Sequence, residues 1–382
     1  MKQQERGRIS AFQYMCILLV IRMTATTVAF PFMTGHESPT DAWIGALIGI
    51  GGSLVLLELM VRLSLYFPDM TVVQFSQALL GKFFGGIAAL LLVGFWVFDA
   101  AVTARAMGSA LVNAFMPETP VLVFIIVTVF FGANGARQGL EITARWSELA
   151  TVGVLMTAIM LVLPFKAMSF QNLLPILPYG LSPHLKRAAT MTSMFLRLSV
   201  LGMMIPYVRN KKDVLRYTRY TVIVSGIVLT AQSIALVAVF GSRAATSAVP
   251  TLQLVRQITI GEFFERIEII PVSLWLLNSG VNIGAFIWAS SLGLAQLFNL
   301  NRFEPLTYPI GGLAVLLGMV LFKNYVEQVR YLIGLQPILV PLVVLGVYLL
   351  LYAGFIFKRL WFPKRTNSGA PAALEADPDD TK

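Results

Sequence analysis

The chain alternates between long apolar stretches and short connections that are polar or rich in proline. A stretch of about 20 mostly apolar residues is long enough to cross a bilayer as a helix. On this criterion the pattern predicts ten membrane-spanning helices, at residues 11–33, 41–66, 86–113, 119–136, 143–165, 186–208, 216–240, 268–298, 307–322 and 333–357. The sequence therefore predicts an all-α integral membrane protein.

Composition agrees with this prediction and narrows the functional classes. Hydrophobic residues make up 57% of the chain and charged residues 13%, and the mean hydropathy is +0.76, which excludes an ordinary soluble domain. One cysteine, Cys16, allows no intramolecular disulfide, and the two histidines, His36 and His184, fall in different loops. We therefore expect no metal site, no cofactor and no enzymatic activity, since no nucleophile–base pair or phosphate-binding loop is present.

The distribution of basic residues predicts the orientation in the membrane. With the N-terminus inside, eighteen Lys and Arg lie in the cytoplasmic connections and the adjoining span ends, against eight on the outer side, with Arg22, Arg105 and Arg197 left inside spans, as the positive-inside rule predicts. The net charge of +10 thus reflects topology rather than nucleic-acid binding. We expect a cytoplasmic N-terminus at 1–10, a membrane domain at 11–360 and a disordered cytoplasmic tail at 361–382, whose Ala, Pro and Asp cannot form a core. No removable signal peptide is expected, because the first apolar segment is too long and contains Arg22.

Ten spans allow two inverted halves of five, at about 11–165 and 186–357. In such proteins the first span of each half is discontinuous and forms the binding site near the middle of the membrane. Spans 1 and 6 would form this pair, and each carries an arginine near its middle, Arg22 and Arg197. Between spans 2 and 3, residues 68–85 predict an amphipathic helix that ends near Gly81.

The first span contains the first candidate site. An arginine at the centre of a membrane helix costs roughly 3 kcal/mol on insertion scales, so Arg22 should face protein or water. Thr24, Thr26 and Thr27 follow it. Their hydroxyls are candidates for ligand contact, and the alternative is that they bond back to the preceding helical turn.

The other candidates lie in spans 3, 6 and 8. Asp99 can bind a ligand ammonium or a coupling ion, while Arg22 and Arg197, beside Ser199, can bind a carboxylate. The alternative is that each arginine pairs with an internal acid, and Asp99 is the obvious partner. Asn278 and Asn282 form a polar stripe that either contacts ligand or holds helices together. Near the helix ends, spacing of three or four residues predicts structural ion pairs of Glu58 with Arg62, and of Arg145 with Glu141 and Glu148.

Several stretches together resemble a known family. They include Pro68-Asp69 through Ser76 and Gly81-Lys82, Arg105 in span 3, Ile205-Pro206-Tyr207 followed by Asn210-Lys211-Lys212, Glu265-Arg266-Ile267-Glu268, and Gly293-Leu294-Ala295-Gln296-Leu297-Phe298 followed by Arg302. In these the chain resembles the GerAB-like spore germination permeases, the B subunits of endospore germinant receptors. The resemblance runs from about residue 9 to residue 360.

The resemblance implies the amino acid–polyamine–organocation transporter fold, related to that of LeuT, with five-plus-five inverted repeats. It also implies a nutrient receptor at the spore inner membrane that senses a small molecule, typically an amino acid. Its partners would be the A and C subunits of the receptor and the lipid bilayer, with no role for nucleic acid. Two positions depart from the pattern. Thr24 falls where relatives often have Gly, and Leu196-Arg197 falls where many have Gly-Glu.

Three functions remain open from the sequence. The first is a receptor subunit that binds nutrient and signals to partner subunits, and the second is a secondary amino-acid permease. The third is a nutrient-gated ion-conducting subunit. All three need a polar site near the middle of the membrane and a helix bundle that changes shape.

Overall fold

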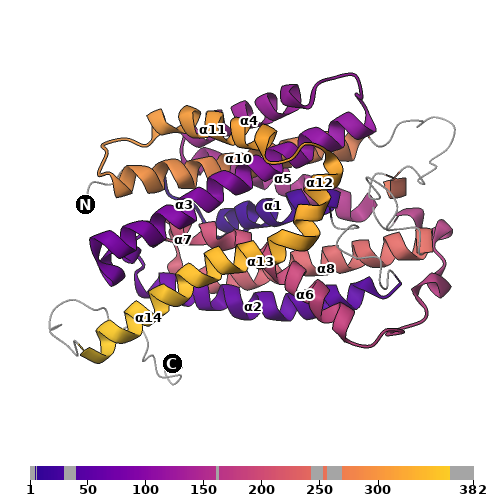
Figure 1. Ribbon diagram of the computed structural model, residues 1–382, viewed down its shortest axis with the longest axis horizontal. Coiled ribbons are helices and arrows are strands. Elements are labelled where there is room, and N and C mark those ends of the chain that lie inside the picture. Colours follow the sequence, from indigo (N-terminus) through magenta and orange to yellow (C-terminus); the bar gives the residue numbers. More distant parts are fainter. Residues whose placement is uncertain are drawn as a thin grey trace, which may run out of the picture.

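The computed structural model describes residues 5, 7–29, 40–160, 163–241, 253–255 and 269–361. Within these ranges the regular structure is helical, apart from one isolated parallel bridge between Ile9 and Val208. Figure 1 shows the helices running roughly along the long axis of the molecule, with the end of the last helix at the left-hand side. We refer to this side as the terminal end and to the other as the distal end.

Most of the helices follow one another with short connections. They are α1 (Ala11–Ala29), α2 (Ala42–Tyr66), α3 (Val72–Ala114), α4 (Val121–Arg137), α5 (Leu140–Met160), α6 (Ser182–Phe195), α7 (Leu201–Met204), α8 (Val214–Phe240), α10 (Ile269–Leu297), α11 (Thr307–Val320), α12 (Tyr325–Arg330), α13 (Gln336–Val340) and α14 (Gly346–Trp361). The last three are joined by π-turns at Tyr331–Leu335 and Pro341–Leu345, so that α12 to α14 form one long rod.

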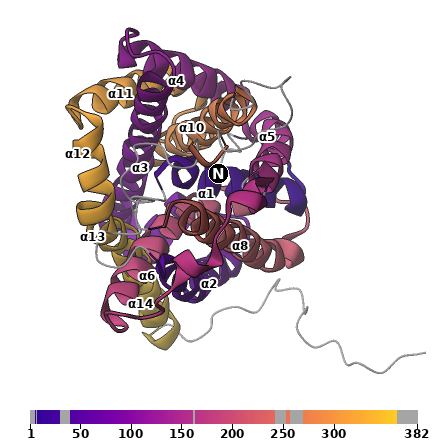
Figure 2. The ribbon, with the colours of Figure 1, turned by 90° about the vertical axis from the view of Figure 1, so that its right-hand side faces the viewer.

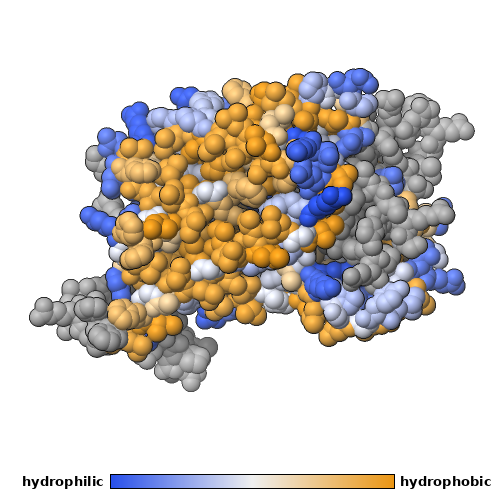
Figure 3. All heavy atoms as spheres, in the orientation of Figure 1, coloured by the Kyte–Doolittle hydropathy of each residue, from blue (hydrophilic) through white to orange (hydrophobic). Residues whose placement is uncertain are grey.

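The predicted ten spans are confirmed as helices. Among the described residues, seven helical segments are long and apolar enough to cross a membrane, and shorter apolar helices lie at Ala11–Thr24, Val121–Arg137 and Glu304–Val320. Figure 3 shows a broad hydrophobic belt around the middle of the visible face, with hydrophilic residues at both ends. Large apolar side chains that are more than half exposed contribute to this belt, for example Val55, Leu316 and Leu349. Since lipid replaces water around such a belt, the surface is that of a membrane protein.

The helices pack as two groups. In the first group α2 lies against α6 and α8, and α8 lies against α1. In the second group α3, α4, α10 and α11 lie against one another, while α1 and α5 both contact α10. Figure 2 shows α2, α6 and α8 on one side of α1 and α4, α10 and α11 on the other. The first group contains spans 1, 2, 6 and 7 and the second contains spans 3, 4, 8 and 9. Equivalent spans of the two halves thus share a group, as an inverted repeat requires.

Spans 1 and 6 were both predicted to be discontinuous, and the structure shows an irregular segment in span 6 but not in span 1. Span 6 changes helix type in its middle, where α6 gives way to a 3-10 segment at Leu196–Val200 before α7. Short 3-10 segments within a helix often mark a functional hinge. In contrast, α1 stays helical from Ala11 to Ala29, so the predicted break near Thr24 is corrected. The position carries no glycine, and the Thr24 hydroxyl donates to the Val20 carbonyl at 2.6 Å, which satisfies the hydroxyl within the helix.

The predicted amphipathic helix between spans 2 and 3 is the first part of α3. Thr71 caps its start together with Gln74, whose side chain accepts from the Thr71 amide. Gly81 has φ 81° and ψ 170°, a conformation that favours glycine, and it separates this short helix from the membrane helix that follows. The stretch Glu265-Arg266-Ile267-Glu268 and the tail beyond residue 361 lie outside the described residues.

A carboxylate near the N-terminus joins three distant parts of the chain. Glu5 is only 5% exposed. Its Oε1 accepts from the Gly7 amide at 2.7 Å. Its Oε2 accepts from the Leu140 amide at 3.1 Å and from the Trp288 indole at 2.8 Å. Because Leu140 is the first residue of α5, the carboxylate lies at the positive end of that helix dipole.

Backbone contact fixes α4 against α10. A methyl group added at Gly132 would lie 2.9 Å from both the Gly280 carbonyl oxygen and the Gly284 amide nitrogen. A methyl group at Gly284 would in turn lie 2.9 Å from the Gly132 carbonyl oxygen. Small residues allow membrane helices to approach this closely, and the contact makes α4 and α10 one rigid unit.

We expect Gly132→Ala to destabilise the protein by about 1–3 kcal/mol, because the added methyl group overpacks this contact. Gly135→Ala is the matched control on the same helix, since no atom lies within 4 Å of its Cβ position. The control should be neutral or stabilise by up to about 1 kcal/mol, the helix-propensity gain of Ala over Gly. Melting temperatures in detergent measure both variants. Equal melting temperatures would show that the two helices can move apart freely.

Candidate functional site

Three of the predicted charged residues lie in the interior. Arg22, Asp99 and Arg197 are 1%, 4% and 3% exposed. They come from α1, α3 and the 3-10 segment of span 6, so they lie where the two helix groups meet. Charges in such surroundings are rare and are retained for a structural partner or a function.

Asp99 and Arg197 form an ion pair. Arg197 Nε donates to Asp99 Oδ2 at 2.7 Å, and Arg197 Nη2 donates to the Thr103 hydroxyl at 2.8 Å. The guanidinium also lies 5.8 Å from the centre of the Phe286 ring on α10. Of the two arginines that sequence reasoning left open, it is therefore Arg197 that pairs with Asp99. The pair links span 6 of the first helix group to α3 of the second.

Arg22 points toward α6. Its Nη2 lies 2.8 Å from the Met191 sulfur, and its guanidinium stands 4.0 Å from the centre of the Phe195 ring. Phe195 is two residues before Arg197, and the two arginine charges are close enough to interact. The interior around Asp99 therefore holds two positive charges, Arg22 and Arg197, and one negative charge.

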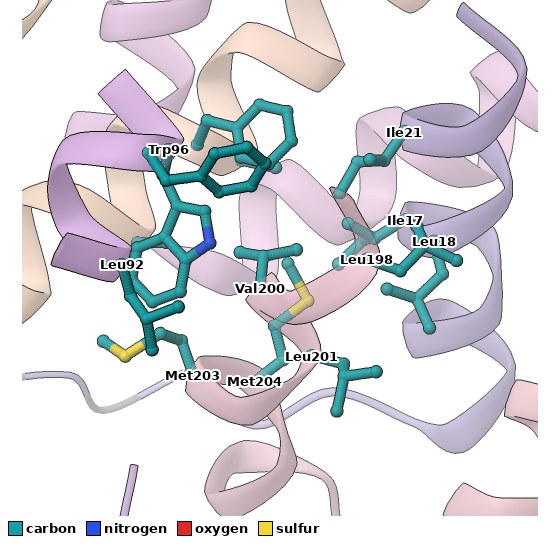
Figure 4. Close-up of a cluster of buried hydrophobic side chains, with 14 of the residues drawn as sticks. Ile17, Leu18, Ile21, Leu92, Trp96, Leu198, Val200, Leu201, Met203 and Met204 are labelled. Atoms are coloured by element: carbon teal, nitrogen blue, oxygen red, sulfur yellow. The ribbon is translucent and has the colours of Figure 1, made fainter. Parts of the chain in front are cut away.

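An apolar cluster closes the terminal side of the ion pair. Figure 4 shows Trp96 of α3 beside Val200 of span 6, with Ile17 and Ile21 of α1 on the other side. The Trp96 indole donates to the Ser199 hydroxyl at 3.2 Å. All of these side chains are buried, so water is excluded from this side, and the ion pair is stronger than it would be in a hydrated site.

For the remaining predicted residues, the alternatives were contact with a ligand and hydrogen bonding within the protein. The Thr24 hydroxyl bonds back to its own helix, which is the structural alternative. Thr26 and Thr27 lie within α1, but their side chains lie outside what the structure describes. The Ser199 hydroxyl accepts from Trp96, and its carbonyl accepts from the Tyr348 hydroxyl at 3.4 Å.

The two asparagines of α10 are buried near the site. Asn282 is one helical turn from Phe286, and Asn278 is one turn further. Asn282 is fully buried, and neither polar atom of its side chain has a hydrogen-bond partner among the described residues. The same holds for Asn278 Oδ1. The interhelical hydrogen bonds expected of residues that hold helices together are thus missing at Asn282 in the described part, so its amide stays a candidate for ligand contact.

Sequence reasoning missed several contributors. Thr103 lies one turn from Asp99 on the same face of α3, so helical spacing could have identified it. Phe195, Phe286 and Trp96 gave no sequence signal, since aromatic residues are frequent in membrane helices and only the tertiary packing selects these three.

Two of the ion pairs predicted near the helix ends are confirmed, whereas Arg145 forms no ion pair with Glu148 among the described residues. Arg62 contacts Glu58 at 2.6 Å, and Arg145 contacts Glu141 at 2.7 Å. Arg219 of α8 also contacts Glu58 at 2.8 Å, so this pair ties α2 to α8. These side chains are largely or partly exposed, and we assign them a structural role.

Solved structures with this arrangement are transporters. The chain superposes on the outward-open state of a Na+-coupled sialic acid symporter with a TM-score of 0.67 and 11% identity, over 92% of this chain and 80% of the symporter. It superposes on the nucleobase-cation-symport-1 family transporter Mhp1 with a TM-score of 0.61 and 10% identity, over 95% and 97%. For MhsT the TM-score is 0.56 at 11% identity, over 93% of this chain and 99% of MhsT. The protein thus has the LeuT fold, as predicted.

Sequence comparison then defines the family. The family described as "Spore germination protein", of the spore permease type, matches residues 8–326. Spore germination protein KB of Bacillus subtilis (strain 168) is 23% identical over 94% of this chain and 97% of its own length. Spore germination protein YndE of the same organism is 25% identical over 81% and 86%, respectively. The chain belongs to the spore germination protein family, and this membership confirms the resemblance noted in the sequence.

We expect Arg197→Ala to destabilise the protein by about 3–5 kcal/mol, because it leaves the Asp99 carboxylate buried without its cation. The double variant Asp99→Asn with Arg197→Met removes both charges and should recover most of this loss. Arg62→Ala is the control, since it breaks an ion pair that is 60% exposed on the arginine side and should cost at most about 1 kcal/mol. Melting temperatures of the four proteins measure the effect. An Arg197→Ala variant as stable as Arg62→Ala would contradict the assignment of a buried pair.

Proposed function

We propose that this protein is the nutrient-sensing B subunit of a spore germinant receptor. Its ligand would be a small molecule, in our proposal an amino acid, bound near the middle of the membrane. The observation that carries the proposal is the buried Asp99–Arg197 pair at the junction of the two helix groups. A carboxylate and a guanidinium at one buried point are complementary to the ammonium and carboxylate of an amino acid.

The relatives and the fold support this proposal. Relatives that match most of the chain are named for spore germination. A protein of the same fold, MhsT, was solved in complex with L-phenylalanine. The proposed ligand contacts are Arg22, Asp99, Arg197, Ser199, Asn278 and Asn282, with Thr24, Thr26 and Thr27 of α1. We place the protein in the spore inner membrane with both termini in the cytoplasm, acting together with A and C subunits and without a cofactor or catalytic step.

Signalling follows from the geometry of the site. A ligand shifts a conformational equilibrium only by as much as its affinity differs between the two states. Because the ion pair joins α3 to span 6, a ligand bound there contacts both helix groups and favours one relative position of the two. Partner subunits would respond to the relative position of the two helix groups.

A secondary permease is the second candidate. The observation that favours it is the likeness to Na+-coupled and other symporters over nearly the whole chain. The same site and the same movement of the two groups would serve transport if the ligand were released on the other side.

We expect spores that lack the gene to lose germination in response to one class of nutrient, while vegetative cells that express the protein show no gain in amino-acid uptake. Germination scored nutrient by nutrient, together with uptake of radiolabelled amino acids, measures both properties. Normal germination together with a gain in uptake would instead establish the permease.

We expect Asp99→Asn to shift the nutrient dose response to at least about tenfold higher concentration, since loss of one charge-assisted hydrogen bond costs roughly 1.5–3 kcal/mol. Protein abundance in the spore membrane, measured by immunoblot, should stay unchanged. Lys82→Gln, outside the site at the terminal end of α3, is the control and should leave the response unaltered. An unchanged dose response for Asp99→Asn would remove this residue from the site.

A further inference from the structure

The ion pair leaves much of its bonding capacity unused by the contacts described above. An ionised carboxylate accepts about four hydrogen bonds, and a guanidinium donates five. Arg197 uses Nε for Asp99 and Nη2 for Thr103. The contact between the two charged groups therefore runs through a single hydrogen bond rather than the bidentate pair that gives arginine–carboxylate contacts their greatest strength. A partner with equal charge and better geometry can replace either member.

We propose that Arg197 is an internal substitute for the ligand's ammonium group, and that a nutrient binds by exchanging partners with the Asp99–Arg197 pair. The ligand's ammonium takes the place of the guanidinium at Asp99, and its carboxylate receives the released guanidinium. This inference rests on the proposed function and deepens it, because it assigns the charged groups that the nutrient must carry and the residue that selects for them.

Charge balance in the buried site provides the argument for a ligand with both charges. An amine alone would displace Arg197 and leave a guanidinium, 3% exposed, without its anion. An acid alone would leave Asp99, 4% exposed, without its cation. Breaking a buried pair by removing one partner is strongly unfavourable. Only a zwitterion keeps both buried charges paired, so Arg197 rejects simple amines and Asp99 rejects simple acids.

The exchange also acts on the 3-10 segment of span 6, which is the part of the fold that would move. Arg197 lies in the 3-10 segment at Leu196–Val200, and Ser199 of the same segment contacts Trp96 of α3 and Tyr348 of α14. Before exchange, Arg197 holds this segment to α3 directly. After exchange, the ligand lies between the two, and the segment must move to make room. Arg22, whose guanidinium stands on the Phe195 ring, provides a positive field on the side where the carboxylate would lie.

Binding to the full-length protein in lipid nanodiscs tests the proposal. The twenty common L-amino acids are first screened by isothermal titration calorimetry. The tightest binder is then compared with its decarboxylated amine and with its deaminated acid. Wild type should bind the amino acid at least about tenfold more tightly than either analogue, which corresponds to 1.4 kcal/mol.

Variants of Arg197 and Asp99 test the discrimination against amines and the binding of the amino acid separately. Arg197→Met should lose the discrimination against the amine, so that the ratio of the two dissociation constants falls toward one, and Arg197→Lys should restore part of it. The double variant Asp99→Asn with Arg197→Met keeps the site free of unpaired charge, and it should bind the amino acid at least about tenfold more weakly than wild type. Arg105→Met is the matched control, because Arg105 is also buried on α3 but donates to the carbonyl oxygens of Gly318 and Lys323. It should keep the wild-type ratio.

Two results would overturn the exchange. If the double variant binds as tightly as wild type, or if Arg197→Met keeps full discrimination, the nutrient binds elsewhere; the proposed function then stands while this inference fails. If wild type binds none of the amino acids and the deleted spores germinate normally, the proposed function fails together with it.

Discussion

The cost of placing charge in a nonpolar interior governs this structure. Asp99 and Arg197 satisfy each other across the junction of the two helix groups, and the 3-10 segment of span 6 brings the guanidinium to the carboxylate. Trp96 and the apolar cluster exclude water on one side, and Phe286 lies against the guanidinium from α10. The position of three spans therefore depends on one hydrogen-bonded pair, and any molecule that enters the site has to match its charges.

Much of the architecture follows from sequence pattern, because bilayer thickness sets the length of each span independently of tertiary contacts. The ten helices and the positions of Arg22, Asp99 and Arg197 near the middle of their spans were predicted, and all three side chains are buried. The partner of Asp99 was not predicted, since both arginines lie at similar depth and only the packing of span 6 against α3 decides between them. The continuity of α1 also escaped prediction, because the Thr24 hydroxyl bonds to its own helix rather than to a neighbour.

The two helix groups differ in how they are held. The second group contains backbone contact between α4 and α10 at glycines, which leaves no freedom for sliding. The first group contains the 3-10 segment of span 6, and the rod of α12 to α14 contains two π-turns. Irregular hydrogen bonding of this kind makes a helix easier to bend. The rigid part of the protein therefore lies on the α3 side of the ion pair and the deformable part on the span 6 side.

The Glu5 carboxylate has a consequence for the order in which the chain assembles. Its partner Trp288 lies 283 residues further along. Trp288 lies within span 8, so seven spans and most of the eighth are synthesised before the segment around Glu5 can make all of its hydrogen bonds. This segment precedes the ten spans in the chain, yet it is among the last to reach its final place. Complete burial of Glu5 is thus a mark of a fully assembled helix bundle rather than an early step of folding.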